Sequence, residues 1–382
     1  MSEFQYYEFQ AIDRPLTDAD RKYLRTLSSR AEITSRSLIN TYQWGDFKGS
    51  PVKLMERCFD LHLYWANWGT RRLMIRVPDR LVDRALLQRC VGEDDRVELH
   101  EAGANAILNI TSPEDEQPDE DWGGDDGLDS LLGDLAPLRG DLLSGDRRLY
   151  YLFWLLGVPI GEVRDEAPEP LPGLGPLTVP LLVFGKLFGI DPDLMHAAAE
   201  RPAAPAAAVA SPDAGRRYVR AMTEAEKSAL LLRLLDGDPH VAADLQAGLR
   251  TMLAADNPAP AMTRRTLAEL QARAGEVREA REQKAREAAQ AAAERQAKAA
   301  ERARRARLDA LAQRGKAVWP EVEAQIELRN AGGYDRATAL LVDLEALAKE
   351  EGTAAAFARR MAAIRERHGN KKRFIERIEG LG

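Results

Sequence analysis

The sequence is poor in cysteine and has no apolar run long enough to cross a bilayer. Cys58 and Cys90 are the only cysteines among 382 residues, so no disulfide framework holds the fold. The most apolar stretches, 149–160 and 177–190, fall well short of the roughly 20 residues that a membrane helix needs, and they predict buried core helices. Residues 1–7 carry an acid and two tyrosines, where a secretory signal has basic and then apolar residues. We therefore expect a cytoplasmic protein with no membrane partner.

The sequence also lacks the short motifs that mark common catalytic sites. It has no glycine-rich phosphate loop, no Gly-x-Ser-x-Gly turn, no His-Glu-x-x-His helix and no set of protein-kinase motifs. Gly173 and Gly175 precede Pro176, which predicts a turn and not a phosphate cradle. We expect no cofactor, and a non-catalytic protein more than an enzyme. An enzyme of unrecognised type, centred on Asp60 and His62, stays open as an alternative.

Charge is plentiful but unevenly distributed. The formal net charge of −7 does not favour a protein built mainly to bind nucleic acid. Nine acidic residues, with glycines at 123 and 124, fall within residues 113–129, and this composition predicts a flexible acidic loop over 113–130. Residues 263–316 hold 15 Arg or Lys against 8 Asp or Glu, a net charge of +7. That segment could attract phosphate backbones in a salt-dependent way, although a charge-laced helix is more often a solvated spacer.

Strand and helix patterns interleave over residues 1–112 and predict a layered α+β domain. Thr17 is expected to cap the first helix. Pro51 is expected to start a second helix that carries the apolar stripe Leu54, Cys58, Leu61 and Trp65 and ends at Gly69. The expected strands are 6–12, 37–44 and 73–77, followed by a hairpin of 97–100 with 106–111 around Gly103.

The rest of the chain reads as predominantly helical. Thr223 and Glu226 form a predicted capping box for one of its helices. Residues 263–316 are Ala, Glu, Arg and Lys almost exclusively, which predicts one long charged helix that is either solitary or paired through alanines. The expected segments are a helical region over 131–200, an Ala/Pro linker over 201–215, short helices over 216–258, the charged helix over 263–316 and a C-terminal helical array over 318–382.

The C-terminal segment resembles the helical tail found in bacterial SWIM zinc finger proteins. The residues that carry the resemblance are Trp319, Tyr334-Asp335-x-Ala337, Leu340-Leu341-x-x-Leu344, Phe357, Arg365-x-Arg367-His368, Lys372 and Phe374. The chain lacks the Cys-x-Cys and Cys-x-His pairs of the SWIM module, so the resemblance implies no zinc or DNA function. It implies a shared helical tail and a SWIM-type protein as a candidate partner. The N-terminal region, with Trp44 and Trp65 in its aromatic motifs, resembles an uncharacterised bacterial family.

An aromatic and basic set in the N-terminal domain is a candidate binding surface. Such residues could stack on bases, although aromatics at the ends of strands and helices are more often core. We keep both readings. The set consists of Trp44, Phe47, Trp65, Trp68, Arg71 and Arg72.

Two cysteines and two histidines of the same domain are weak candidates for the ligands of a metal ion. Cys58 and His62 would lie one turn apart on the helix predicted from Pro51, and Cys90 and His100 follow along the chain. These are ligand types that zinc prefers, but their spacings match no common zinc motif. We expect no bound metal, with Cys58 acting as a small core residue.

The sequence thus favours a non-catalytic interaction or scaffolding protein that binds a protein partner. The alternatives are a nucleic-acid-associated accessory factor, which would use the basic helix and the surface around Trp68, and the unrecognised enzyme.

Overall fold

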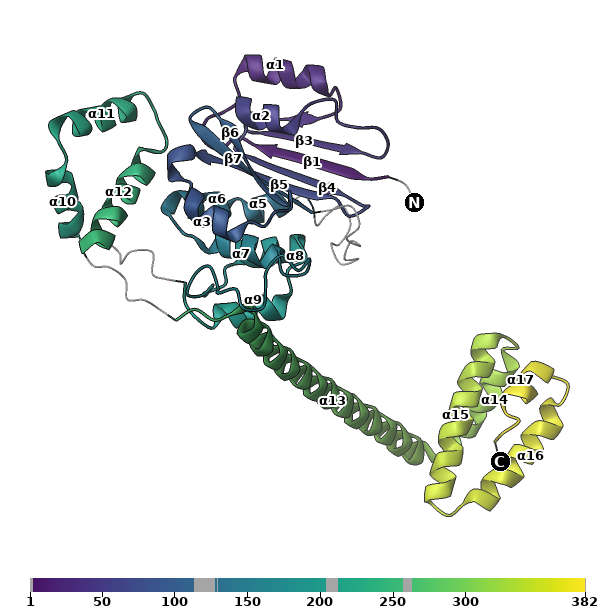
Figure 1. Ribbon diagram of the computed structural model, residues 1–382. Helices are drawn as coiled ribbons and strands as arrows, with labels where there is room; N and C mark the ends of the chain where they lie inside the picture. The colour runs from purple at the N-terminus through teal and green to yellow at the C-terminus, as the bar shows by residue number, and fades with distance from the viewer. Residues whose placement is uncertain (1–2, 113–127, 129, 204–211, 257–262, 382) are drawn as a thin grey trace. The chain divides into compact units, whose positions relative to one another are not determined.

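The computed structural model describes residues 3–112, 128, 130–203, 212–256 and 263–381 (Figure 1). It is an α+β protein in which helix predominates, as the sequence predicts. The chain divides into two compact units, Met1–Ala280 and Arg281–Gly382. Except for residues 128 and 130, the predicted acidic loop lies outside the described residues. Residues 204–211 of the predicted linker do as well.

The first unit is built on one antiparallel sheet of seven strands in the order β2-β3-β1-β4-β5-β7-β6. The first strand, β1, lies inside the sheet because it pairs with β3 on one side and β4 on the other. The strands are β1 (Gln5–Gln10), β2 (Glu32–Ile33), β3 (Ser37–Tyr42), β4 (Leu61–Ala66), β5 (Arg71–Pro78), β6 (Val97–Ala102) and β7 (Asn105–Ser112). The predicted hairpin around Gly103 is confirmed as β6 and β7, and Gly103 has the positive φ of +67° that its turn requires.

The predicted helix from Pro51 to Gly69 is wrong in its second half. Helix α2 (Pro51–Arg57) ends at its C-cap Cys58, and β4 follows after Asp60. Strand β4 is buried on both faces and pairs with β1 and β5, so its apolar side chains form a continuous run. Its hydrophobicity therefore does not alternate with the period of two that marks a half-buried strand. Leu61 and Trp65 happened to match the spacing of a helical stripe.

Two short helices cover one face of the sheet (Figure 1). Helix α1 (Asp18–Leu27) has the predicted Thr17 cap, completed by the side chain of Asp20 as a capping box. With α2 it closes a core of aromatic and aliphatic residues that includes Phe9, Phe59 and Met74.

A larger set of helices covers the opposite face. The largest core of the molecule lies here, between the sheet residues Leu63, Ile75 and Leu108 and the helices. These helices are α3 (Arg84–Cys90), α5 (Leu131–Leu135), α6 (Pro137–Ser144), α7 (Arg148–Leu156), α8 (Val179–Leu187) and α9 (Pro192–Ala199), with a single 3-10 turn, η1 (Asp79–Leu81), before α3.

Three further helices form a small module over residues 212–256: α10 (Pro212–Ala221), α11 (Glu224–Leu235) and α12 (Val241–Asp256). The predicted capping box of Thr223 and Glu226 is present at the start of α11. Helix α10 begins at Pro212, inside the stretch predicted as a linker.

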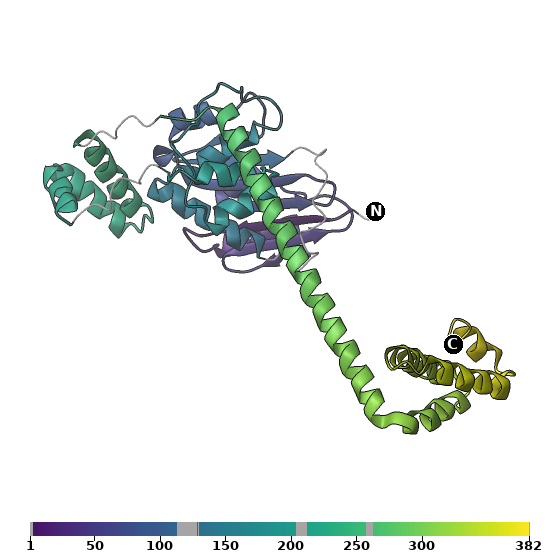
Figure 2. The same ribbon diagram turned by 90° about the horizontal axis from the view of Figure 1, so that it is seen from below.

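The predicted charged helix is α13 (Leu267–Arg314), 48 residues long and unbroken (Figure 2). Its first turns pack on the first unit through Leu267, Leu270 and Ala274. Every residue from 279 to 307 is exposed, so the packing of its early turns does not continue along the helix.

The second unit has its own core, formed by residues that include Val322, Leu341, Met361 and Phe374. Thr353 stands at the N-cap position of the helix Ala354–His368, but its side chain makes no capping hydrogen bond. The elements are η2 (Gly315–Ala317), α14 (Val318–Glu327), α15 (Ala331–Glu350), α16 (Ala354–His368) and α17 (Lys372–Arg377). No helix among the described residues is long and apolar enough to span a membrane.

Candidate functional site

The four metal-ligand candidates do not come together. Cys58 belongs to the core under α1 and α2, whereas Cys90 belongs to the core on the other face of the sheet. His62 lies on β4 and not on the helix of Cys58, so the predicted one-turn spacing between them is wrong. His100 lies on strand β6, whereas Cys90 is the last residue of helix α3. The described residues contain no cluster of three or more His, Cys, Asp or Glu that could hold a metal.

His62 is a core residue. Its ring stacks on Phe9 with centroids 3.9 Å apart, and its Nδ1 lies 2.9 Å from the carbonyl oxygen of Glu8. Burial lowers the pKa of His62 to about 3, so the ring is neutral at physiological pH. With Nδ1 as the donor, Nε2 is left as a buried acceptor without a hydrogen-bond partner among the described residues.

The predicted aromatic and basic set is distributed over both faces of the sheet. Phe47 is buried against Tyr7 and Phe9 under the short helices. Trp65 packs against Phe4 and the large core on the other face. Arg71 is buried and donates to the carbonyl oxygen of Leu187.

Of the remaining members, Trp44 is 68% exposed and lies under the guanidinium of Arg30. Trp68 is half-buried in the turn between β4 and β5, and Arg72 is half-buried on β5. The set does not form one continuous surface.

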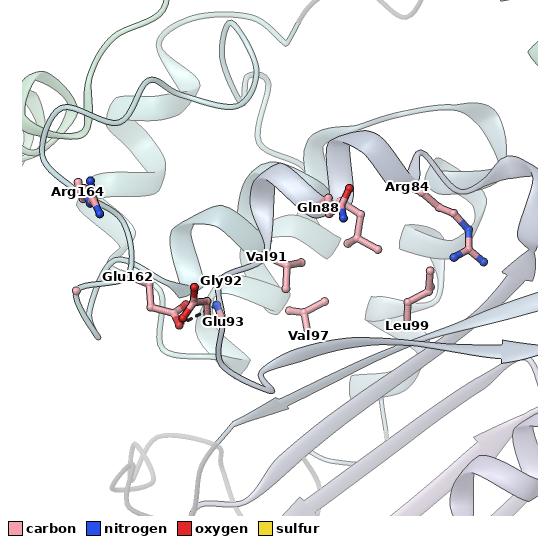
Figure 3. Close-up of a pocket in the computed structure, with 11 residues that line it drawn as sticks. Arg84, Gln88, Val91, Gly92, Glu93, Val97, Leu99, Glu162 and Arg164 are labelled. Carbon is pink, nitrogen blue, oxygen red and sulfur yellow. Dashed lines mark hydrogen bonds between the residues drawn. The ribbon is translucent and has the colours of Figure 1, made fainter.

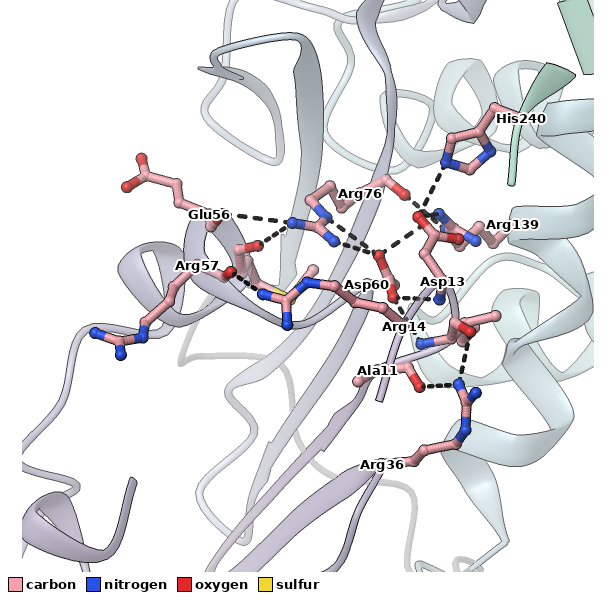
Figure 4. Close-up of polar contacts among 12 residues, drawn as sticks. Ala11, Asp13, Arg14, Arg36, Glu56, Arg57, Asp60, Arg76, Arg139 and His240 are labelled. Carbon is pink, nitrogen blue, oxygen red and sulfur yellow. Dashed lines mark hydrogen bonds and ion pairs between the residues drawn. The ribbon is translucent and has the colours of Figure 1, made fainter. Parts of the chain in front are cut away.

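A buried network of charges holds the loop after β1 to the sheet (Figure 4). Asp60 is 1% exposed and accepts the backbone N–H groups of Ile12 at 2.6 Å and Asp13 at 2.9 Å. Its other oxygen receives a forked pair of bonds from Arg76. Every oxygen of this carboxylate is therefore occupied, which suits a structural ion pair better than a catalytic base.

The same network reaches the helical module of 212–256. The carboxylate of Asp13 lies 2.7 Å from Arg139 Nη2 and 2.9 Å from Nε2 of His240, just before α12 (Figure 4). Burial acts to raise the pKa of Asp13, but the hydrogen bonds from His240 and Arg139 outweigh it and hold that pKa well below its usual value. Arg80 adds a forked ion pair to Asp244 of α12.

A hollow lies beside the edge strand β6. It has a volume of about 920 Å³ and lies between α3 and β6, with the 161–164 turn at one end (Figure 3). Leu87 and Val97 form a buried floor, and Val91 and Leu99 are partly exposed walls. We call this hollow the β6 groove.

The outer edge of β6 carries backbone groups that the sheet does not use. Thr111 N–H donates to the carbonyl of Arg96, so in the antiparallel register Arg96, Glu98 and His100 point their backbone groups towards β7. The intervening residues, Val97, Leu99 and Glu101, therefore point theirs outward. No other strand of the described residues pairs with this edge.

Glu162 shapes the end of the groove. One of its carboxylate oxygens accepts the backbone N–H groups of Glu93 at 3.1 Å and Asp94 at 2.9 Å, which fixes the turn before β6. A Cβ atom at Gly92 would lie 1.6 Å from the other oxygen of Glu162, so a larger residue there would force the Glu162 side chain to move. Burial, aided by the nearby charge of Glu162, raises the pKa of Asp94.

The lining of the β6 groove combines polar and apolar side chains. Its lining includes Arg84, Gln88, Glu93 and Arg164 as polar side chains, and no Ser, Thr, Cys or His. The neighbouring Cys90 is buried, which raises the pKa of its thiol to about 12 and leaves it un-ionised.

Sequence reasoning missed this groove for two reasons. Helix α3 is only seven residues long and has no strong helical pattern, and Glu162 is about 70 residues distant from the turn that it holds. The alternation of Val97 and Leu99 and the capping Asp83 were the available signals. Searches of protein-family models, of curated proteins and of solved structures each return no match to this chain.

Proposed function

We propose that the protein is a non-catalytic interaction protein and that its first unit binds an extended segment of a protein partner along β6. The observation that carries the proposal is the edge of β6 itself. Val97, Leu99 and Glu101 offer outward N–H and C=O groups in a row beside the β6 groove, whose floor is apolar. An added strand would use those groups for affinity and the groove for specificity.

The alternation of side chains along an added strand determines which residue types the bound segment should carry. Every second side chain of an added strand would enter the groove over Leu87 and Val97, which favours aliphatic residues at those positions. The intervening side chains would lie on the face of Glu98 and His100. Glu98 favours Lys or Arg there, since opposite charges on neighbouring strands attract. A SWIM-type protein is the candidate partner that the resemblance of the tail implies.

A peptide-display selection on the immobilised full chain tests the proposal. We expect enriched peptides with alternating aliphatic and basic residues. Their affinity should fall about tenfold or more in a Glu101→Pro protein, which loses an outward N–H group but no bond to β7. Glu101→Ala is the matched control, because it keeps that N–H group and should bind within about threefold of wild type. The proposal fails if no peptide is enriched, or if both variants bind alike.

A further inference from the structure

A second hollow adjoins the β6 groove beyond the start of β6. It has a volume of about 430 Å³ and shares part of its lining with the groove, so the two hollows are neighbours; the shared residues are Val91, Gly92, Glu162 and Arg164. Figure 3 shows where it lies: Arg84 and Leu99 stand at one end of the groove, and Glu162 and Arg164 stand at the other. We call this second hollow the end hollow.

The interior of the end hollow is apolar. Cys90 and Trp154 are buried in its lining and belong to the large core on that face of the sheet. Val163 and Ala167 line it as well, and both are partly buried and pack against the same core. A concave site of this size with apolar walls suits an apolar group of a ligand.

Charged side chains surround this apolar interior. Arg89, Arg164 and Glu166 are exposed members of the lining. Glu162 offers a ligand little of its charge, because one of its oxygens accepts two backbone N–H groups and the other is buried. A guanidinium group attracts the face of an aromatic ring, and an aromatic ring gains further from contact with a second ring such as that of Trp154. The lining therefore favours an aromatic group over an aliphatic one.

We propose that the end hollow receives the side chain of a Phe, Tyr or Trp residue from the segment that binds along β6. The inference rests on the proposed function, because a strand added beside Val97 leads from the groove to the end hollow. Gly92 lines both hollows and has no side chain to separate them. Alternate side chains of the added strand face the groove, so the next one past Val97 would enter the end hollow. An aromatic anchor in such a pocket contributes more to affinity than the contacts around it.

Titrations of the full chain with peptides from the display selection test the anchor. The enriched peptides should carry one aromatic residue at one end of their alternating stretch. Replacing that residue by Ala should weaken binding to the wild-type protein about tenfold or more. Replacing one of the basic residues of the same peptide by Ala is the control, and it should weaken binding about threefold or less. An Ala-substituted peptide that binds within about threefold of its aromatic parent overturns the inference.

Filling the end hollow tests where the anchor binds. Ala167→Trp places an indole in the hollow, and it should weaken the aromatic peptide about tenfold but the Ala-substituted peptide less than about threefold. Val163→Phe fills the hollow from another wall and should act in the same way, and urea unfolding shows that each variant is folded. Ala85→Trp is the matched control, because Ala85 is exposed on α3 and lines neither hollow. If the two filled variants weaken both peptides alike, or neither, the anchor does not bind in the end hollow.

The Glu101→Pro protein separates this inference from the proposed function. It removes an N–H group of the strand edge, so it should weaken the aromatic peptide and its Ala-substituted form by the same factor. An effect of Glu101→Pro without an effect of the filled variants would overturn the aromatic anchor and leave strand addition standing. Peptides that bind Glu101→Pro like wild type would overturn both proposals.

Discussion

At the scale of single residues, His62 couples the stability of the sheet to pH. Its folded pKa of about 3 lies below the ordinary value of 6.5, so protonation favours the unfolded chain. The stabilising effect is complete above pH 6.5 and is lost as the pH falls from there towards 3. For one proton the slope approaches about 1.4 kcal/mol per pH unit.

We therefore predict that His62→Gln makes stability less sensitive to pH. The free energy of unfolding in urea should fall by about 1 kcal/mol less in the variant than in wild type between pH 6.5 and 5.5. His100→Gln is the control, since the His100 side chain is 35% exposed on the edge strand. An unchanged pH slope in His62→Gln would show that His62 does not control this titration.

The charge of Asp60 is buried inside the first unit and paired with Arg76. Asp60→Asn keeps the shape of the side chain but leaves Arg76 without its counter-charge and turns an acceptor into a donor. We expect a loss of about 3–5 kcal/mol in the free energy of unfolding, measured by urea titration of the first unit. Asp18→Asn, at a side chain that is 83% exposed and pairs with Arg21, should cost less than about 0.5 kcal/mol. Equal losses in the two variants would contradict the structural role of Asp60.

At the scale of elements, the sequence patterns predicted amphipathic elements better than buried ones. The Thr17 helix, the hairpin around Gly103, the Thr223 capping box and the charged helix were all predicted from local signals, and all are present. Strand β4 was not, because a strand buried on both faces loses its alternation. The β6 groove was not predicted either, since its walls meet only after residues far apart in the sequence pack together.

Two threonines at helix starts provide a contrast. The Thr17 hydroxyl accepts a hydrogen bond from the N–H of Asp20 at 3.1 Å. Thr353 occupies the N-cap position of α16, but its hydroxyl makes no capping hydrogen bond. Thr17→Ala should lower the stability of the first unit by about 1 kcal/mol. Thr353→Ala should change the second unit by less than about 0.5 kcal/mol. Hydrogen exchange in the first turns of α1 and α16 measures the two effects locally, and equal effects would contradict the assigned caps.

At the scale of the whole molecule, the two units have separate cores. A substitution that destabilises one unit should therefore leave the free energy of unfolding of the other unchanged. Met361 is fully buried in the core of the second unit. We predict that Met361→Ala destabilises that unit by about 2–5 kcal/mol. Trp154 lies in the core of the first unit and Trp319 in the second, so fluorescence of single-tryptophan proteins can follow each unit during urea unfolding. A shift of the Trp154 transition would contradict the independence of the two units.

The order in which the sheet and its cover are encoded has a consequence for synthesis on the ribosome. All seven strands are complete by Ser112, but apart from α3 the helices that cover the face of Leu63, Ile75 and Leu108 are encoded later, up to Ala199. At about 5–20 residues per second, translating that interval takes roughly 4–17 s. During that time a finished sheet would display its largest apolar face. A chaperone that binds nascent chains would therefore find the most exposed apolar surface of this protein in this interval, before all the covering helices have been synthesised.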